Sequence, residues 1–304
     1  MIYTVTLNTT LDLVYETAQI SKNEINKTEL KVLSVGGKGI NISRALRSLE
    51  VESQAFGFYG GQMKELLLTK LATEGILNHL IQIKGNTRTN LKIIENNLKN
   101  VVEFNEIGPK ILLEELEAIL KLIKNKCTRG DFLVLAGSLP QDVPADFYKD
   151  IINIVQKKDT QVLLDTSGDP LRQGIRAGPD FLKVNFEEIR AIKAGGDLET
   201  LIRGLSKAGI KKIMVTDGAK RVLYWDGTRV LSAVPPKVEG AASVGSGDSV
   251  DAGMIYSIIK GFDPINLLKT SVACGTANLL TYAPGQIDKK KVKNLTRDIT
   301  VKEL

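Results

Sequence analysis

A glycine-rich turn followed by an acid stands near the end of the sequence, at Val244-Gly-Ser-Gly-Asp-Ser-Val-Asp-Ala-Gly253. Glycine permits backbone conformations that a Cβ atom forbids, and the start of a helix exposes N–H groups that attract phosphate. We therefore predict an anion site at Gly245, Ser246 and Gly247. The carboxylate of Asp248 would repel an anion bound there, so an acid at this position is unexpected unless it has a chemical role. Asp248 is therefore a candidate base; the alternative is that it only caps its helix.

A second glycine cluster, Ser34-Val-Gly-Gly-Lys-Gly-Ile-Asn41, precedes an apolar pattern with helical spacing. It predicts another helix start that combines flexible backbone, a cation (Lys38) and an amide (Asn41). The cluster is no Walker-type P-loop, because it lacks the four-residue spacer and the Lys-Ser/Thr ending.

Composition is that of an ordinary globular chain: 304 residues, 43% hydrophobic and 25% charged, with a formal charge of +6. Apart from the run in Asp288–Lys293, which is typical of a solvated helix, the lysines are dispersed, so we expect no nucleic-acid partner. No stretch resembles a signal peptide or a membrane span, so we expect a cytoplasmic protein without a membrane partner.

The residue types available limit the chemistry. A triad or a His/Cys metal site would need His79, the one histidine, which we place at a loop-to-strand junction with no nucleophile elbow nearby. Cys127 and Cys274 have no CxxC spacing and are expected to be inert core thiols. Carboxylates, lysines, arginines and backbone amides remain, and these are the groups used in phosphoryl transfer.

Strand-like and helix-like patterns alternate along the chain, which predicts a mainly parallel sheet with helices on both faces. Ligands of such sheets bind at the carboxyl ends of the strands, where the sequence has polar residues, for example Asp165. The expected strands are Tyr3–Leu7, Phe132–Ala136, Val162–Asp165, Phe181–Val184 and Ile213–Thr216, and expected helices include Leu112–Lys124 and Ala145–Val155. Leu13–Ile20 and the hairpin-like pair Asn90–Ile94 and Val101–Asn105 break this rhythm and predict a small separate β element.

The two glycine clusters together resemble the two signatures of the PfkB (ribokinase-like) family of carbohydrate kinases. The opening segment and three further motifs are similar to the family's hexose-phosphate branch: Thr87-Arg-Thr-Asn90, Asn105-Glu-Ile-Gly-Pro109 and Ala136-Gly-Ser-Leu-Pro140. The resemblance covers nearly the whole chain. It implies one catalytic domain over 1–304, a ribokinase-like three-layer α/β/α sandwich whose mainly parallel central sheet carries a small β-sheet lid. Inserted segments at about 10–21 and 88–105 would form the lid, which in the family often pairs with a partner's lid in a homodimer.

The resemblance also implies residues that bind the sugar phosphate. Asp12 ends the motif Asn8-Thr-Thr-Leu-Asp12, in which Thr9 replaces the family's proline, and it would bind sugar hydroxyls. Arg88 would hold the phosphate already on the sugar, as a planar guanidinium can, whereas Ser138 would either bind the same phosphate or cap a turn. Lys38 has the alternative of being a solvated lysine. The full predicted substrate set is Asp12, Gly37, Lys38, Asn41, Arg88, Asn90 and Ser138.

ATP and Mg²⁺ are the implied cofactors. In Lys183-Val-Asn-Phe-Glu-Glu188, Asn185 and Glu188 form the family's Asn-x-x-Glu pair and are expected on one helix face. Both would hold Mg²⁺, Glu188 through water if needed. Asp251 stands where relatives usually have a small or apolar residue, so it either raises the pKa of a neighbouring acid or points into solvent. The predicted cofactor-binding set is Lys183, Asn185, Glu188, Thr216, Gly218 and Gly247.

The function implied is ATP-dependent phosphorylation of a ketohexose phosphate, D-fructose 1-phosphate giving D-fructose 1,6-bisphosphate. Asp248 would take the proton of the acceptor hydroxyl, while the 245–247 amides stabilise the transferring group. Tagatose 6-phosphate and fructose 6-phosphate are the alternative substrates. A sugar-phosphate-binding protein without catalysis stays open because Thr9, Val184 and Ala242 depart from the family pattern, although Asp248 argues against it.

Overall fold

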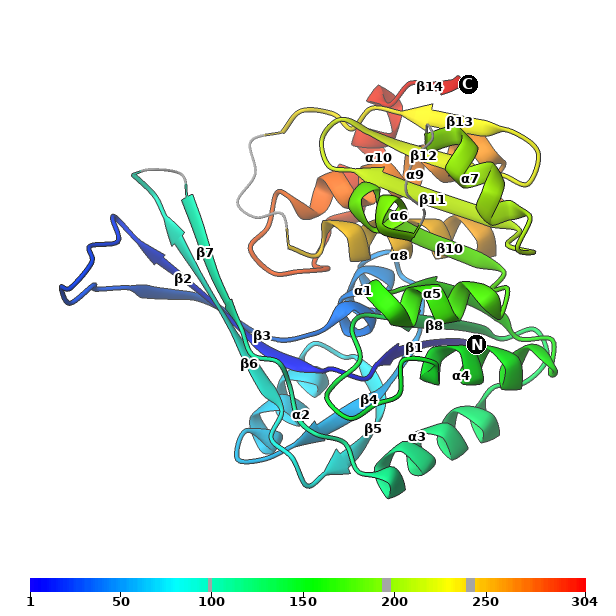
Figure 1. Ribbon diagram of the computed structural model, residues 1–304. Helices are drawn as coiled ribbons and strands as arrows, with labels where there is room; N and C mark the ends of the chain where they lie inside the picture. The colour runs from blue at the N-terminus through cyan, green and yellow to red at the C-terminus, as the bar shows by residue number, and fades with distance from the viewer. Residues whose placement is uncertain (98–99, 193–197, 239–243) are drawn as a thin grey trace.

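The computed structural model describes residues 1–97, 100–192, 198–238 and 244–304, which form two β-sheets and a set of helices (Figure 1). The strands are β1 Ile2–Thr6, β2 Thr10–Thr17, β3 Glu29–Gly36, β4 Gln54–Gly60, β5 Leu77–Ile83, β6 Arg88–Glu95, β7 Asn100–Asn105, β8 Phe132–Ala136, β9 Gln161–Asp165, β10 Phe181–Asn185, β11 Lys212–Asp217, β12 Arg221–Trp225, β13 Val230–Ala233 and β14 Val301–Glu303. The helices are α1 Lys38–Ser48, α2 Lys64–Thr73, α3 Leu113–Lys126, α4 Phe147–Gln156, α5 Gly168–Arg176, α6 Phe186–Ile192, α7 Leu198–Ser206, α8 Ser246–Ile259, α9 Pro264–Asn278 and α10 Lys289–Asp298.

The larger sheet has ten strands in the order β14-β13-β12-β11-β10-β9-β8-β1-β4-β5. The seven strands from β5 to β11 are parallel, and β12, β13 and β14 extend the sheet with antiparallel pairings. The central strands β1 and β8 are buried along their whole length, as is typical of parallel strands covered by helices on both faces. The predicted three-layer fold with a mainly parallel sheet is confirmed.

Helices cover both faces of the large sheet and enclose two large hydrophobic cores, and a third, smaller cluster joins Leu67 and Leu71 of α2 to Val35 of β3 and Ala55 of β4. On one face, α3 to α7 pack over residues such as Leu133 and Leu182, and Tyr148 is fully buried there. On the other face, α1, α8, α9 and α10 pack over residues such as Val134 and Met214. This layering brings the starts of α1 and α8, which hold the two glycine clusters, together on one face of the sheet.

The smaller sheet projects from the body of the molecule and has the order β3-β2-β6-β7 (Figure 1). β2 pairs antiparallel with β3 and parallel with β6, and β7 pairs antiparallel with β6. The sequence predicted the other three strands of this sheet but missed β3, whose first residues Glu29, Leu30 and Lys31 are all exposed and so give no apolar alternation. Residues 98 and 99 of the expected hairpin loop lie outside the described part.

Two further sequence interpretations need correction. His79 lies within β5, where its Nε2 is 2.8 Å from Gln54 Oε1, because the strand begins at Leu77 rather than after the histidine. The helix expected from Ala145 begins at Phe147, since Asp146 is its N-cap.

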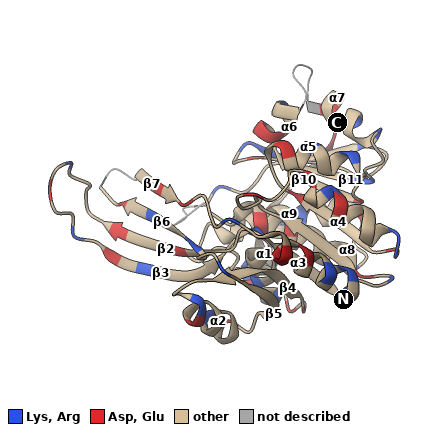
Figure 2. Ribbon diagram, turned by 60° about the horizontal axis from the view of Figure 1, so that its bottom comes forward, with Lys and Arg blue, Asp and Glu red and all other residues tan. Residues whose placement is uncertain are grey.

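Charged residues are distributed over the elements of both sheets with the two signs interspersed (Figure 2). No helix in the described ranges combines the length and apolar character required to cross a bilayer.

Candidate active site

The glycine-rich turn lies between two cavities at the carboxyl ends of the parallel strands. Gly245 and Asp248 line a cavity of about 380 Å³, while Ser246 and Gly247 line a second one of about 620 Å³. A group held in either cavity would therefore meet the same helix N-terminus, which is a favourable place for an anion.

The first cavity brings together every predicted substrate residue. Its lining comes from both sheets, from α1 and from the start of α8. Among the lining residues are Asp12, Gly37, Lys38, Asn41, Arg88, Asn90, Ser138 and Glu188.

The second cavity joins part of the predicted nucleotide set to apolar side chains. Thr216, near the end of β11, and Gly218, just after the strand, line it together with Val250 and Leu279. Of the predicted nucleotide-binding residues, Lys183 and Asn185 line neither of these two cavities in the described part of the chain. The Lys183 side chain is 5% exposed and lies beneath the turn at Gly247, whereas Asn185 lines a separate cavity with residues of α5 and α6.

The start of α8 explains why glycine precedes the acid. Gly245 is the N-cap with φ of 83°, a left-handed conformation, and a Cβ on it would lie 2.7 Å from Pro284. Asp248 is 6% exposed, and its Oδ2 accepts a hydrogen bond of 2.8 Å from Asn41 Nδ2. The carboxylate is thus held across the cavity by α1. Burial raises the pKa of Asp248, and the nearby Lys38 opposes this shift.

Arg44 fixes the orientation of Asn41. Its Nη1 donates to Asn41 Oδ1 at 2.9 Å and to the Pro284 carbonyl at 2.7 Å, while the guanidinium also pairs with Glu74. Because the amide oxygen is engaged by Arg44, the amide NH₂ faces Asp248. Sequence reasoning missed this residue, although it lies one helical turn after Asn41 on α1.

A buried carboxylate links the two lysines. Asp165 is fully buried. Its Oδ1 lies 2.6 Å from Lys38 Nζ, and its Oδ2 lies 3.1 Å from Lys183 Nζ. Burial alone would raise the pKa of Asp165, but the two ammonium groups hold it below its usual range. Burial likewise opposes the charge on each lysine, and Asp165 outweighs it, so the pKa values of Lys38 and Lys183 are raised. Lys38 is therefore anchored, not a freely solvated lysine.

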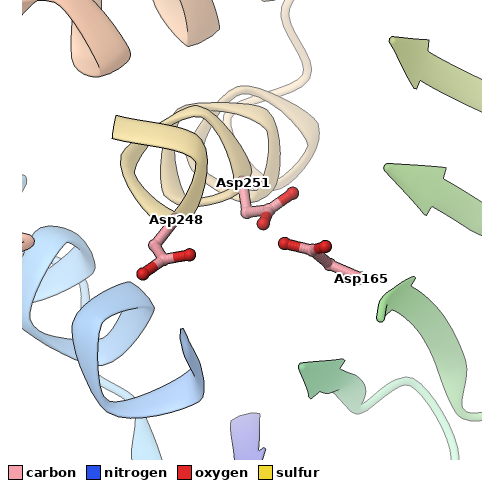
Figure 3. A group of neighbouring side chains, drawn as sticks. All are labelled: Asp165, Asp248 and Asp251. Carbon is pink, nitrogen blue, oxygen red and sulfur yellow. The ribbon is translucent and has the colours of Figure 1, made fainter. Parts of the chain in front are cut away.

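The role of Asp165 was not predicted, although its place at the carboxyl end of β9 was noted. Asp251 does not point into solvent: it is fully buried and faces Asp165 (Figure 3). Carboxylate oxygens of Asp165, Asp248 and Asp251 lie within 4.8 Å of one another, a spacing that could hold a cation. Burial and the charge of Asp165 raise the pKa of Asp251 well above its usual value.

The small sheet contributes the other wall of the first cavity. Asp12 and Asn90 are paired in register on β2 and β6, and Asn90 Nδ2 donates to Asp12 Oδ1 at 3.0 Å. A Cβ on Gly36, at the end of β3, would lie 1.8 Å from Asp12 Oδ2, so glycine leaves the space that this carboxylate fills. Burial raises the pKa of Asp12.

Arg88 and Ser138 are both held by the first turn of the chain. The Arg88 guanidinium donates to the carbonyls of Asn8 and Glu106, and Asn8 Nδ2 donates to Ser138 Oγ at 3.1 Å. Burial lowers the pKa of Arg88, and Asp12 opposes this shift.

Asn185 and Glu188 were expected on one face of a helix, but only Glu188 lies on a helix. β10 continues to Asn185, which pairs with Thr216, and α6 begins only at Phe186. Asn185 Oδ1 accepts from the Glu188 N–H at 2.8 Å, and Glu188 Oε2 accepts from the Asn185 N–H at 2.7 Å. The two side chains therefore cap the helix reciprocally.

The groups expected to be inert lie outside this arrangement. Cys127 and Cys274 are buried, and burial raises the pKa of each thiol to about 12. Burial also lowers the pKa of His79.

The α/β sandwich and a helix N-terminus between two cavities form an architecture suited to a phosphotransferase. Comparison with known proteins identifies the family. The model of the pfkB family of carbohydrate kinases matches residues 4–290, so this chain belongs to that family. It is similar to the 1-phosphofructokinases of Borreliella burgdorferi (32% identity, 92% of each chain covered) and Bacillus subtilis (31% identity, 100% of each). Among solved structures, it is similar to phosphofructokinase-2 from Escherichia coli, with a TM-score of 0.91 and 25% identity over 98% of each chain. Ala242, one of the departures noted above, lies outside the described residues.

Proposed function

We propose that this protein phosphorylates D-fructose 1-phosphate with ATP to give D-fructose 1,6-bisphosphate. The carrying observation is the position of Asp248 and the glycine turn between two adjoining cavities, one rich in polar groups and one largely apolar. Four curated relatives with 27–32% identity over nearly the whole chain are named 1-phosphofructokinase, which supports this substrate.

In this proposal the sugar phosphate binds in the first cavity. Asp12 accepts hydrogen bonds from sugar hydroxyls, and Arg88 binds the existing phosphate as a cation with fixed geometry. Lys38 lies between Asp165 and the cavity, where its charge offsets that of the transferring group. Asp248 takes the proton of the acceptor hydroxyl, which its raised pKa favours because a base near the operating pH accepts protons most effectively.

ATP binds in the second cavity, with its base among the apolar side chains and its phosphates directed at the turn. The N–H groups of residues 245–247 are preorganised donors for the transferring phosphoryl group. Thr216 and Gly218 border this path, and Lys183 contributes its charge from below.

Mg²⁺ is the expected metal, and the donor set beside the turn fits it. Capping uses one oxygen of Glu188, so the second carboxylate oxygen remains, and Glu188 lines the first cavity. Glu188 would hold the ion directly or through water, with Asn185 beside it. When bound, Mg²⁺ would supply positive charge that offsets the negative charge of the ATP phosphates.

We further propose that 1–304 form one cytoplasmic catalytic domain whose small sheet acts as a lid. Exposed apolar side chains on this sheet, including Leu30 on β3 and Phe104 on β7, would bury themselves in a homodimer formed through the lids. Sedimentation of the native chain and of Phe104→Asp tests this assembly, and a native monomer would contradict it.

Fructose 6-phosphate is the second candidate, because a solved structure of the Escherichia coli relative holds fructose-6-phosphate. The deciding assay measures ADP release with fructose 1-phosphate, fructose 6-phosphate, tagatose 6-phosphate and free fructose. We expect the highest kcat/KM with fructose 1-phosphate. A preference for another phosphate would change the substrate, and turnover of none would favour a binding protein.

A further inference from the structure

Asp251 is a buried acid for which the described part of the chain places no N–H or O–H donor. It lies on α8 one turn after Asp248, is 0% exposed, and within the described residues neither carboxylate oxygen has a hydrogen-bond partner. Its carboxyl group points at that of Asp165 on β9 (Figure 3). A buried ionised carboxylate is normally paired or accepts several hydrogen bonds, so this one has an unusual environment.

The charged groups that face Asp251 come from four elements. They are Asp165 on β9, Lys183 on β10, Lys38 on α1 and Asp248 on its own helix. From α9 the titratable group is Cys274, whose Sγ lies near Gly253 rather than near the carboxyl cluster. If every acid in this group were ionised, three carboxylates would face two ammonium groups. One further positive charge would make the buried cluster neutral.

That charge could be a metal ion or a proton, and the geometry favours a proton. Lys183 Nζ is 3.1 Å from Asp165 Oδ2 and 2.8 Å from where a Cβ on Gly247 would stand, so an ammonium group already lies between the cluster and the turn. Lys38 Nζ lies on the other oxygen of Asp165. A metal ion would be repelled by both, whereas a proton between two facing carboxyl groups needs no further space.

We propose that Asp251 is a neutral carboxylic acid that donates its proton to Asp165, and that this pair positions Lys38 and Lys183 beside the base. Asp165 then accepts from both lysines and from Asp251, which fixes its rotamer and theirs. Asp248 remains the carboxylate in the cluster that faces the first cavity and can take a proton during turnover. Asp251 is thus a positioning residue, and its part in the reaction rests on the proposed kinase function.

Infrared difference spectroscopy tests the proton directly. Native protein minus Asp251→Asn, recorded at pH 7 without ligands, should show the carbonyl stretch of a neutral carboxylic acid, with the expected isotope shift in D₂O. Native protein minus Asp298→Asn, which removes an exposed carboxylate, should show no such band. A native spectrum lacking this band relative to Asp251→Asn would overturn the proposal. If the amide variant does not fold, Asp251→Val provides the same comparison.

The pH dependence of kcat tests the positioning role. Loss of the shared proton at high pH would leave an extra buried negative charge that pulls on Lys183 and Lys38, so native kcat should fall by about tenfold per pH unit above that ionisation. Asp251→Asn carries a neutral donor at every pH and should lose this limb or shift it upward. Superimposable profiles would refute the role. Because the infrared band needs no substrate, absence of kinase activity and absence of the proton are distinguishable outcomes.

Discussion

Replacing Arg88 tests how the sugar's own phosphate is recognised. Arg88 Nε and Nη2 donate to the Asn8 carbonyl at 3.3 and 3.2 Å, and Nη1 donates to the Glu106 carbonyl at 3.0 Å. A guanidinium has five N–H donors, so about two remain for a ligand in the first cavity. These two can form a bidentate contact with one phosphate, held in place by the other three.

Removing this contact has a predictable cost. A hydrogen bond to a charged group contributes roughly 1.5–3 kcal/mol, and about 1.4 kcal/mol corresponds to tenfold in affinity. Arg88→Ala should therefore lower kcat/KM for the sugar phosphate by about one to two orders of magnitude. Arg88→Lys should recover only part, since an ammonium group cannot reproduce the fork or both carbonyl contacts.

The assay is steady-state kinetics with each substrate varied at saturating concentration of the other. Arg129→Ala is the matched control, because the Arg129 side chain is 88% exposed and lies in the turn before β8. The KM for ATP should change by less than about twofold in both variants. The reasoning fails if the Arg88→Ala loss falls on ATP, or if Arg88→Lys equals the native enzyme.

Three further predictions follow from the packing around the site. Gly36→Ala places a Cβ where Asp12 Oδ2 lies, so the KM for the sugar phosphate should rise by about tenfold or more while that for ATP is retained; equal kinetics would show that Asp12 does not bind sugar. Lys183→Met leaves Asp165 with one lysine in a buried site, so urea denaturation should show a loss of about 3–5 kcal/mol, and a loss under about 1 kcal/mol would contradict the bridge. Burial raises the pKa of Asp251, so the chain takes up a proton at this residue when it folds above about pH 4. The free energy of unfolding of the native protein, relative to that of Asp251→Asn, should therefore fall as pH rises, by up to about 1.4 kcal/mol per pH unit. Parallel curves of unfolding free energy against pH would contradict the raised pKa.

The fold could be predicted where local pattern and tertiary environment agree. Phe132–Ala136 is an apolar run buried on both faces, and β8 has the predicted bounds. β3 was not predicted from the sequence, because the first half of this strand is exposed and shows no apolar alternation. β12 to β14 were also missed, and they are short antiparallel strands of three to five residues. β4 and β5, two parallel strands of the large sheet, were not predicted either.

In the candidate site, too, local features could be predicted from the sequence and long-range contacts could not. The glycine clusters predicted the two helix starts, because the backbone conformation of a helix start depends on residues that are adjacent in the sequence. The contact of Lys38 with Asp165 spans 127 residues and that of Asn41 with Asp248 spans 207, so only the sheet topology brings them together. The environment of Asp251 likewise depends on β9 and β10, which no local spacing reports.

The most direct test of the central claim is the turnover of Asp248→Asn. The amide keeps the size of the carboxylate and can still accept from Asn41, so the cavity should retain its shape. We predict that kcat with fructose 1-phosphate falls by roughly 10²-fold or more, while calorimetry shows a sugar-phosphate Kd within about threefold of the native value. Asp298→Asn, on the exposed end of α10, should match the native enzyme in both measurements. A kcat for Asp248→Asn within a few-fold of native would contradict the assignment of the base and with it the mechanism.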